Sequence, residues 1–86
     1  MILINGIKIP ENARAIKLEP SPHLDKAVVE YDKGKDVLVY HVETLISCFV
    51  EQGMTTEEAW EWFDYNTLRT GDYVRNYPKF IYEKKT

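Results

Sequence analysis

The sequence predicts an α+β fold, in which a small antiparallel β-sheet, made of a hairpin and a C-terminal strand, packs against two helices. Three observations lead to this prediction. Two β-branched runs flank a polar connection between residues 27 and 40, apolar residues then recur with a helical period from Val42, and a threonine–glutamate pair opens a second helix near Thr56. Strands and helices segregated along the chain are typical of α+β domains. With 86 residues, the chain has the size of a single domain, residues 1–86.

The N-terminal region begins with two short β-branched runs on either side of Asn5-Gly6. Asn-Gly favours a type I′ turn because both residues tolerate positive φ, so we expect a small hairpin or a kinked edge strand. Residues 10–26 contain three prolines and one short predicted strand at residues 15–19. The Pro20-Ser21-Pro22 run favours extended backbone and predicts a surface connection.

The main hairpin is predicted from residues 27–31 and 37–40, which favour strands and are joined by a polar connection containing glycine. A last strand is predicted at residues 80–82, where Pro78 restricts the preceding residues to a sheet edge or a strand start. We expect these strands to form an antiparallel meander, with the two helices on one of its faces.

The first helix is predicted from the i, i+3, i+4, i+7, i+8 spacing of Val42, Leu45, Ile46, Phe49 and Val50. Gly53 supplies a left-handed residue at its C-terminus. The second helix starts near Thr56, after a capping box, and extends to about Leu68 or Arg69. The predicted core contains Val28, Val37, Val39, Leu45, Ile46, Phe49, Val50, Ala59, Trp62 and Phe63.

The second helix has two chemically different sides. At 100° per residue, one arc holds Ala59, Trp60, Trp62 and Phe63. We therefore interpret both tryptophans as core or near-core residues and not as a ligand platform. The opposite side holds Glu57, Glu58, Glu61, Asp64 and Tyr65.

The segment from Asp36 to Leu68 contains seven acidic residues and no lysine or arginine. Two interpretations are open: an ordinary solvated helix face, or a surface that attracts a basic partner protein. The Thr-Thr-Glu-Glu start of the second helix disfavours helix-turn-helix DNA binding, because that end would meet phosphates and base edges. The net charge of −3 gives no general attraction to nucleic acid, which we expect not to be a partner.

The C-terminal stretch, residues 69–85, interleaves basic residues with tyrosines. This composition supports an alternative function, a nucleic-acid-binding regulator, and is equally typical of a protein interface rich in Tyr and Arg. A third interpretation is an edge strand whose lysines prevent association between edges.

The sequence contains no catalytic signature, so we expect a protein without enzymatic activity, cofactor or metal. Neither His23 nor His41 has a motif partner, and Cys48 is the only cysteine. A lone cysteine on an apolar stripe is interpreted as a buried, inert thiol in a reducing compartment. Because no signal peptide or membrane-spanning run is evident, a cytoplasmic location without membrane association is expected.

The stretch GMTTEEAWEWFDYN, residues 53–66, resembles a motif of short uncharacterised proteins encoded by phages, prophages and bacteria. The resemblance covers roughly residues 37–82 and does not extend to residues 1–26 or to Arg75-Asn76. The matching positions are Gly53, Met54, Thr55, Glu58, Ala59, Glu61, Trp62, Asp64, Tyr65, Asn66, Tyr73, Pro78 and Phe80.

This resemblance implies a mobile-element protein that acts inside a host bacterial cell. Proteins of this size in that setting are often stoichiometric inhibitors of a host enzyme or of a defence complex, including CRISPR effectors, so we expect a protein-interaction module whose partner carries a basic surface. An exposed hydrophobic edge on so small a domain is also compatible with a homodimer. The expected partner-binding residues are Glu57, Glu61, Asp64, Tyr65, Arg69, Tyr73 and Arg75.

Overall fold

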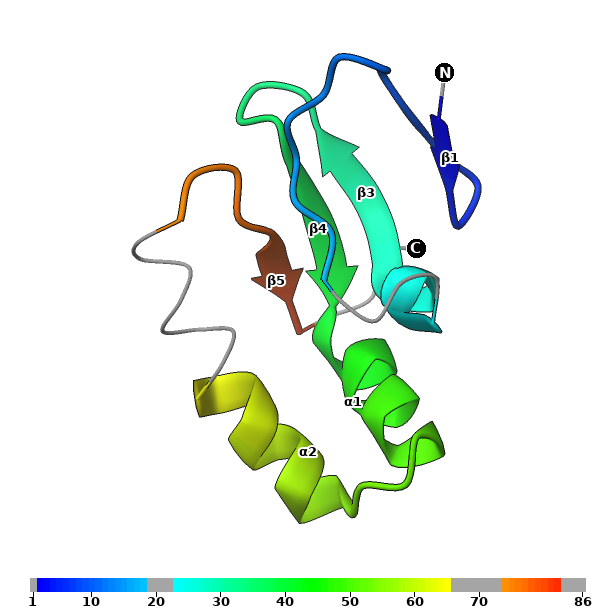
Figure 1. The fold of residues 1–86 in the computed structure, drawn as a ribbon, viewed down its shortest axis with the longest axis vertical. Coiled ribbons are helices and arrows are strands. Elements are labelled where there is room, and N and C mark those ends of the chain that lie inside the picture. The colour runs from blue at the N-terminus through cyan, green and yellow to red at the C-terminus, as the bar shows by residue number, and fades with distance from the viewer. Residues whose placement is uncertain (1, 19–22, 66–73, 83–86) are drawn as a thin grey trace.

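The computed structural model describes residues 2–18, 23–65 and 74–82, and in these residues it contains two β-sheets and two α-helices (Figure 1). The predicted α+β class is confirmed. The two-stranded sheet comes from the N-terminus, and the three-stranded sheet has the order β3-β4-β5. The helices follow β4 in the chain.

The N-terminal hairpin consists of β1 (Ile2–Ile4) and β2 (Ile7–Ile9), paired antiparallel. Its turn residues Asn5 and Gly6 have φ values of 50° and 79°, as a type I′ turn requires. The predicted hairpin is therefore confirmed. The Asn5 side-chain amide donates hydrogen bonds to the carbonyls of Lys26 and Val28, at 3.1 and 2.9 Å, which attaches the hairpin turn to the start of the larger sheet.

The larger sheet combines an antiparallel pair and a parallel pair. Strands β3 (Val28–Asp32) and β4 (Val37–His41) form the predicted hairpin. Strand β5 (Lys79–Ile81) pairs parallel with β4, with Val39 opposite Lys79, so the predicted antiparallel meander is wrong for the C-terminal strand. The reason is the connection: residues 42–78 separate the two strands and contain both helices, and a helical crossover of this kind returns the chain in a parallel direction.

The helices α1 (Val42–Glu51) and α2 (Thr56–Phe63) lie beyond the end of the sheet where β4 finishes, not over one face as predicted (Figure 1). Helix α1 starts directly after His41, the last residue of β4, so it continues away from the sheet. The short 3-10 helix η1 (His23–Ala27) is linked to α1 by an ion pair of 3.0 Å between Lys26 and Glu51. The predicted end of the second helix, at Leu68 or Arg69, lies outside the described residues.

The turn between the helices follows its predicted chemistry. Gly53 has a φ of 108°. The amide of Gly53 donates to the carbonyl of Val50 and that of Met54 to Phe49, at 3.0 and 3.2 Å, which is the hydrogen-bond pattern of a Schellman motif. Thr55 then caps α2, so one compact turn ends the first helix and starts the second.

The N-terminal strap, residues 10–18, crosses the larger sheet in place of the strand predicted at residues 15–19 (Figure 1). Residues 15–18 form no ladder, and the backbone amides of Ile16 and Leu18 bond to other parts of the chain. The amide of Ile16 donates to the carbonyl of Asn76 at 3.1 Å, and that of Leu18 donates to the Tyr40 hydroxyl at 2.9 Å. The connection predicted at Pro20-Ser21-Pro22 lies outside the described residues.

The core is centred on β4, whose five residues are all buried. Of the predicted core, Val50 is an error, since it is 40% exposed, and Trp62 is half-buried. Cys48 is buried in place of Val50. The buried stripe of α1 is therefore rotated toward the side that packs against η1. The core cluster comprises Ile4, Ile9, Leu18, Leu24, Ala27, Val28, Leu38, Tyr40, Val42, Leu45, Ile46, Cys48, Phe49, Ala59 and Phe63.

Replacing Gly53 by alanine should lower the free energy of unfolding by about 1–2 kcal/mol, because a Cβ is disfavoured at positive φ. No atom lies within 4 Å of the position that this Cβ would take, so the cost should come from the backbone alone. Urea unfolding measures it. Gly34→Ala is the matched control, because its new Cβ would also fit without a clash: the nearest atom, Asp32 Oδ1, lies 3.5 Å away. A loss of stability at both positions would contradict the explanation.

Replacing Tyr40 by phenylalanine should destabilise the protein by about 1–3 kcal/mol, because the buried Leu18 amide would lose its hydrogen-bond acceptor. The control is Tyr82→Phe, which removes a hydroxyl from a side chain that is 54% exposed. Thermal unfolding of both variants measures the difference. Equal stability of the two variants would show that the strap does not depend on this bond.

Candidate functional site

The acidic face of α2, defined here as Glu57, Glu61 and the C-cap residue Asp64, is exposed. The opposite side of the helix is anchored in the core: Ala59 and Phe63 are 0% and 1% exposed. The ring of Phe63 meets that of Phe80 in β5 edge-on, with centroids 5.0 Å apart. Because its inner residues are packed, α2 presents its carboxylates from a fixed position.

The two tryptophans of α2 lie on different flanks of this acidic face. Trp62 is half-buried, and its ring lies 4.7 Å from that of Phe49, centroid to centroid. Trp60 is 39% exposed and contacts Phe63 edge-on. The prediction that both are core or near-core residues is therefore wrong for Trp60. Trp60 falls at the boundary of the apolar arc. Because α1 and α2 lie beyond the end of the sheet, the sheet does not cover this boundary as it would if the helices packed on its face.

The start of α2 is held by the predicted capping box. The Glu58 amide donates to the Thr55 hydroxyl at 3.1 Å, and the Thr55 amide donates to the Glu58 carboxylate at 3.0 Å. The hydrogen bonds from the Thr55 amide and hydroxyl lower the pKa of Glu58, because they stabilise its charged form. Glu58 therefore caps α2 and also contributes to the negative charge of this surface.

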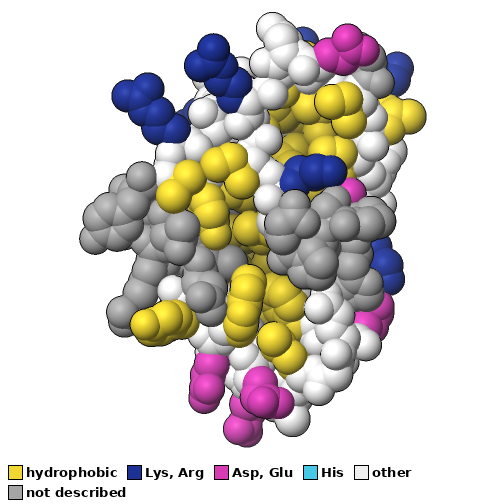
Figure 2. Space-filling model, in the orientation of Figure 1, with side chains coloured by type: hydrophobic (Ala, Val, Ile, Leu, Met, Phe, Trp, Pro, Cys, Tyr) yellow, Lys and Arg dark blue, Asp and Glu magenta, His cyan; other side chains and the backbone are white. Residues whose placement is uncertain are grey.

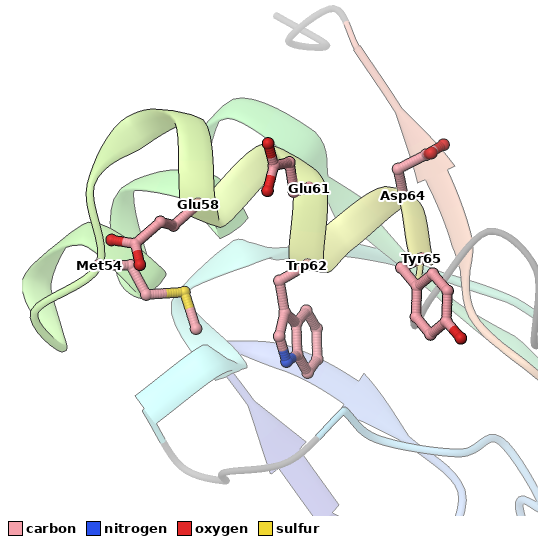
Figure 3. A pocket seen from close by; sticks show the side chains of 6 residues that line it. All are labelled: Met54, Glu58, Glu61, Trp62, Asp64 and Tyr65. Carbon is pink, nitrogen blue, oxygen red and sulfur yellow. The ribbon is translucent and has the colours of Figure 1, made fainter.

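An open hollow lies along α2 and has a volume of about 580 Å³. Figure 3 shows the six side chains that line it, with Trp62 and Tyr65 projecting from the same side of the helix and Glu61 and Asp64 directed away from them. Tyr65 is 68% exposed. We call this feature the α2 hollow; it is lined by Met54, Glu58, Glu61, Trp62, Asp64 and Tyr65.

Other acidic residues of the segment from Asp36 to Leu68 form contacts that stabilise the fold. Asp36 accepts hydrogen bonds from the Tyr31 hydroxyl at 2.6 Å and from the Arg14 amide at 2.9 Å, and these bonds lower its pKa. Glu51 pairs with Lys26. The remaining charge is concentrated on α2, and in Figure 2 acidic side chains gather at the helical end of the molecule while Lys and Arg lie mostly over the sheet.

Of the predicted site residues of the C-terminal region, Arg75 is the one that the structure describes, and it does not join this surface. Arg69 and Tyr73 lie outside the described residues. Arg75 is exposed in the turn before β5. Its neighbour Asn76 donates a hydrogen bond to the carbonyl of Asp36 at 3.0 Å, which places this turn beside the start of β4, at the end of the sheet opposite the helices (Figure 1).

The aromatic residues of the C-terminal region are partly used by the core. Phe80 contacts Tyr40 and Phe63, and Tyr77 packs against Phe80 with centroids 6.3 Å apart. Burial raises the pKa of Tyr77. Within residues 74–82, the exposed residues suited to nucleic acid are Arg75, Lys79 and Tyr82.

Cys48 and His41 are both buried. Cys48 is buried as expected, and burial raises the pKa of its thiol, which disfavours the reactive thiolate. His41 is 3% exposed, and its Nδ1 lies 2.7 Å from the Thr44 hydroxyl. In residues 2–18, 23–65 and 74–82, no three side chains of His, Cys, Asp or Glu come together as metal ligands. No helix in this part of the chain is long and apolar enough to cross a membrane.

Comparison of the chain with protein-family models, with curated proteins and with solved structures finds no match. The interpretation of the α2 surface therefore depends on its own residues. Sequence reasoning identified the carboxylates and Tyr65 but missed the hollow. The i, i+4 spacing of Glu58 with Trp62 and of Glu61 with Tyr65 could have indicated it, whereas the position of Met54 follows from the turn geometry.

The capping box should make the stability of the protein depend on pH. Because the pKa of Glu58 in the folded protein lies below its usual value of 4.5, its charge stabilises the fold above that pH, and this contribution is lost as the pH falls through the lowered pKa. Glu58→Gln keeps an acceptor for the Thr55 amide without the charge. The stability difference between wild type and Glu58→Gln, measured by urea unfolding, should therefore be largest near neutral pH and shrink in acid.

A stability difference that stays constant from neutral pH into acid would contradict this assignment. Thr55→Ser is the positive control, since serine retains the capping hydroxyl and should preserve the pH dependence.

Proposed function

We propose that this protein is a non-enzymatic interaction module that binds a basic surface of another protein through the acidic face of α2. The observation that carries the proposal is the exposure of Glu57, Glu61 and Asp64 on a helix that has no lysine or arginine. Such a surface steers a basic partner toward it at low salt.

The aromatic residues beside the acidic face supply contact area that can contribute more binding energy than exposed charges alone. Interfaces depend on a few large side chains, with Trp, Tyr and Arg most prominent, and exposed ion pairs contribute little. Here Trp60 is 39% exposed and Tyr65 is 68% exposed. Because Ala59 and Phe63 already fix the helix, binding requires little additional ordering of the chain.

The finer form of the proposal concerns the partner. The resemblance of residues 53–66 to phage and prophage proteins supports a host bacterial enzyme or defence complex, CRISPR effectors included, with the protein acting as a stoichiometric inhibitor. This step rests on the motif.

The alternative, nucleic-acid binding by the C-terminal region, has less support from the described residues. Tyr77 and Phe80 pack within the domain, which leaves Arg75, Lys79 and Tyr82 exposed in residues 74–82. Nucleic-acid binding without sequence preference uses exposed rings on which bases stack.

The test is affinity purification of the tagged protein from its bacterial host, followed by mass spectrometry. The variant Glu61→Lys/Asp64→Lys should lose the recovered partner at least about tenfold, because like charges would then face each other across the interface. Glu11→Lys/Glu43→Lys is the matched control: both residues are exposed and neither belongs to α2, and two acid-to-lysine changes raise the net charge from −3 to +1 in either variant.

Circular dichroism should first show that both variants fold. A partner that binds the α2 variant as well as wild type would rule out the acidic face, and the absence of any specific partner would rule out the interaction module. A partner that disappears after nuclease treatment would favour the nucleic-acid alternative.

A further inference from the structure

The aromatic side of the α2 hollow is formed by Trp62 and Tyr65, which are three residues apart and project from the same side of the helix (Figure 3). Residues at this spacing are neighbours on a helix surface. Trp62 is held from beneath by Phe49, whose ring lies at a centroid distance of 4.7 Å. Met54 adds a thioether at the end of the hollow near the N-terminus of α2. The hollow therefore offers apolar and aromatic contact area.

The acidic side of the hollow adjoins these rings. Glu58 precedes Trp62 by four residues, so its carboxylate is a helical neighbour of that ring. Glu61 is directed away from both rings (Figure 3). Asp64 extends the carboxylates along the opposite flank (Figure 3). A ligand lying across the helix would meet rings on one side and negative charge on the other.

From this arrangement we infer that the α2 hollow binds an arginine-containing segment of the basic partner, with a guanidinium against Trp62 and Tyr65. A guanidinium stacks on aromatic faces and also donates planar, paired hydrogen bonds to carboxylates. The lysine ammonium is a compact, strongly hydrated point charge with less affinity for a ring face. A quaternary ammonium has no N–H group to donate to the carboxylates.

The length of the hollow suits more than one side chain of the partner. Its carboxylates are spread along α2, with Glu58 beside Met54 and Asp64 at the end near Tyr65 (Figure 3). Two neighbouring arginines fit this description, one on the rings beside Glu58 and the next toward Glu61 and Asp64. This inference rests on the proposed function, since it specifies the chemistry of the partner at the same face.

The experiment is an NMR titration of the whole protein with two blocked tetrapeptides of equal charge, Gly-Arg-Arg-Gly and Gly-Lys-Lys-Gly, at about 25 mM salt, where surface charges are weakly screened. The arginine peptide should bind about threefold to tenfold more tightly. It should shift the indole N–H resonance of Trp62 more than that of Trp60, which does not line the hollow; Trp60→Phe identifies the two signals.

Two variants separate the rings from the charge. Tyr65→Leu should bring the ratio of the two affinities close to one, because it removes an aromatic face and leaves every carboxylate in place. Tyr82→Leu is the control, since Tyr82 is 54% exposed and lies outside the hollow, and the ratio should not change. Equal affinities in wild type, no binding of either peptide, or a ratio unaffected by Tyr65→Leu would overturn the inference.

The result also distinguishes this inference from the proposed function. If both peptides bind equally and Glu61→Lys/Asp64→Lys abolishes both, charge alone determines binding; the arginine inference fails and the acidic-face proposal stands. If the cellular partner binds that variant as well as wild type, both fail.

Discussion

The arrangement of the whole domain depends on the burial of β4, and within it on Tyr40. This side chain is fully buried, its ring lies 6.1 Å from that of Phe80 in β5, and its hydroxyl accepts a hydrogen bond from the amide of Leu18 in the strap. A buried hydroxyl and a buried amide would each be costly alone, so their bond fixes the strap against the sheet. Because β4 continues directly into α1, the position of the strand also sets the direction in which the helices leave the sheet.

Local chemistry could be predicted from the sequence, and longer-range pairing could not. The Asn5-Gly6 turn, the positive φ of Gly53 and the Thr55–Glu58 capping box each depend on residues a few positions apart, and all three were deduced correctly. The strap depends on Tyr40 and Asn76, which are distant in the chain. Its extended backbone resembles a strand until its hydrogen-bond partners are known. The parallel direction of β5 likewise follows from the path of residues 42–78, which no local pattern specifies.

The candidate site shows the same division. Helical periodicity was sufficient to put Glu57, Glu61 and Asp64 on the side of the helix opposite Phe63. It failed for Trp60, which lies at an arc boundary where exposure depends on how far a neighbouring element extends. The sequence also failed to show that Arg75 lies far from α2. Arg75 follows α2 closely in the chain, but the chain returns to the far end of the sheet before it reaches Arg75. The wrong assignment of Val50 to the core has a similar origin, because η1 packs on one side of α1.

In α2, the residues that pack in the core and the residues that are exposed occupy different positions of a single helix. Ala59 and Phe63 hold it in the core, whereas the residues of the acidic face contribute little to that packing. Substitutions on the outer face can therefore change the exposed surface without a matching change in the scaffold. Glu58 is the exception, because one carboxylate both caps the helix and lines the hollow. At that position a change of the exposed surface is also a change of stability, so the two cannot vary independently.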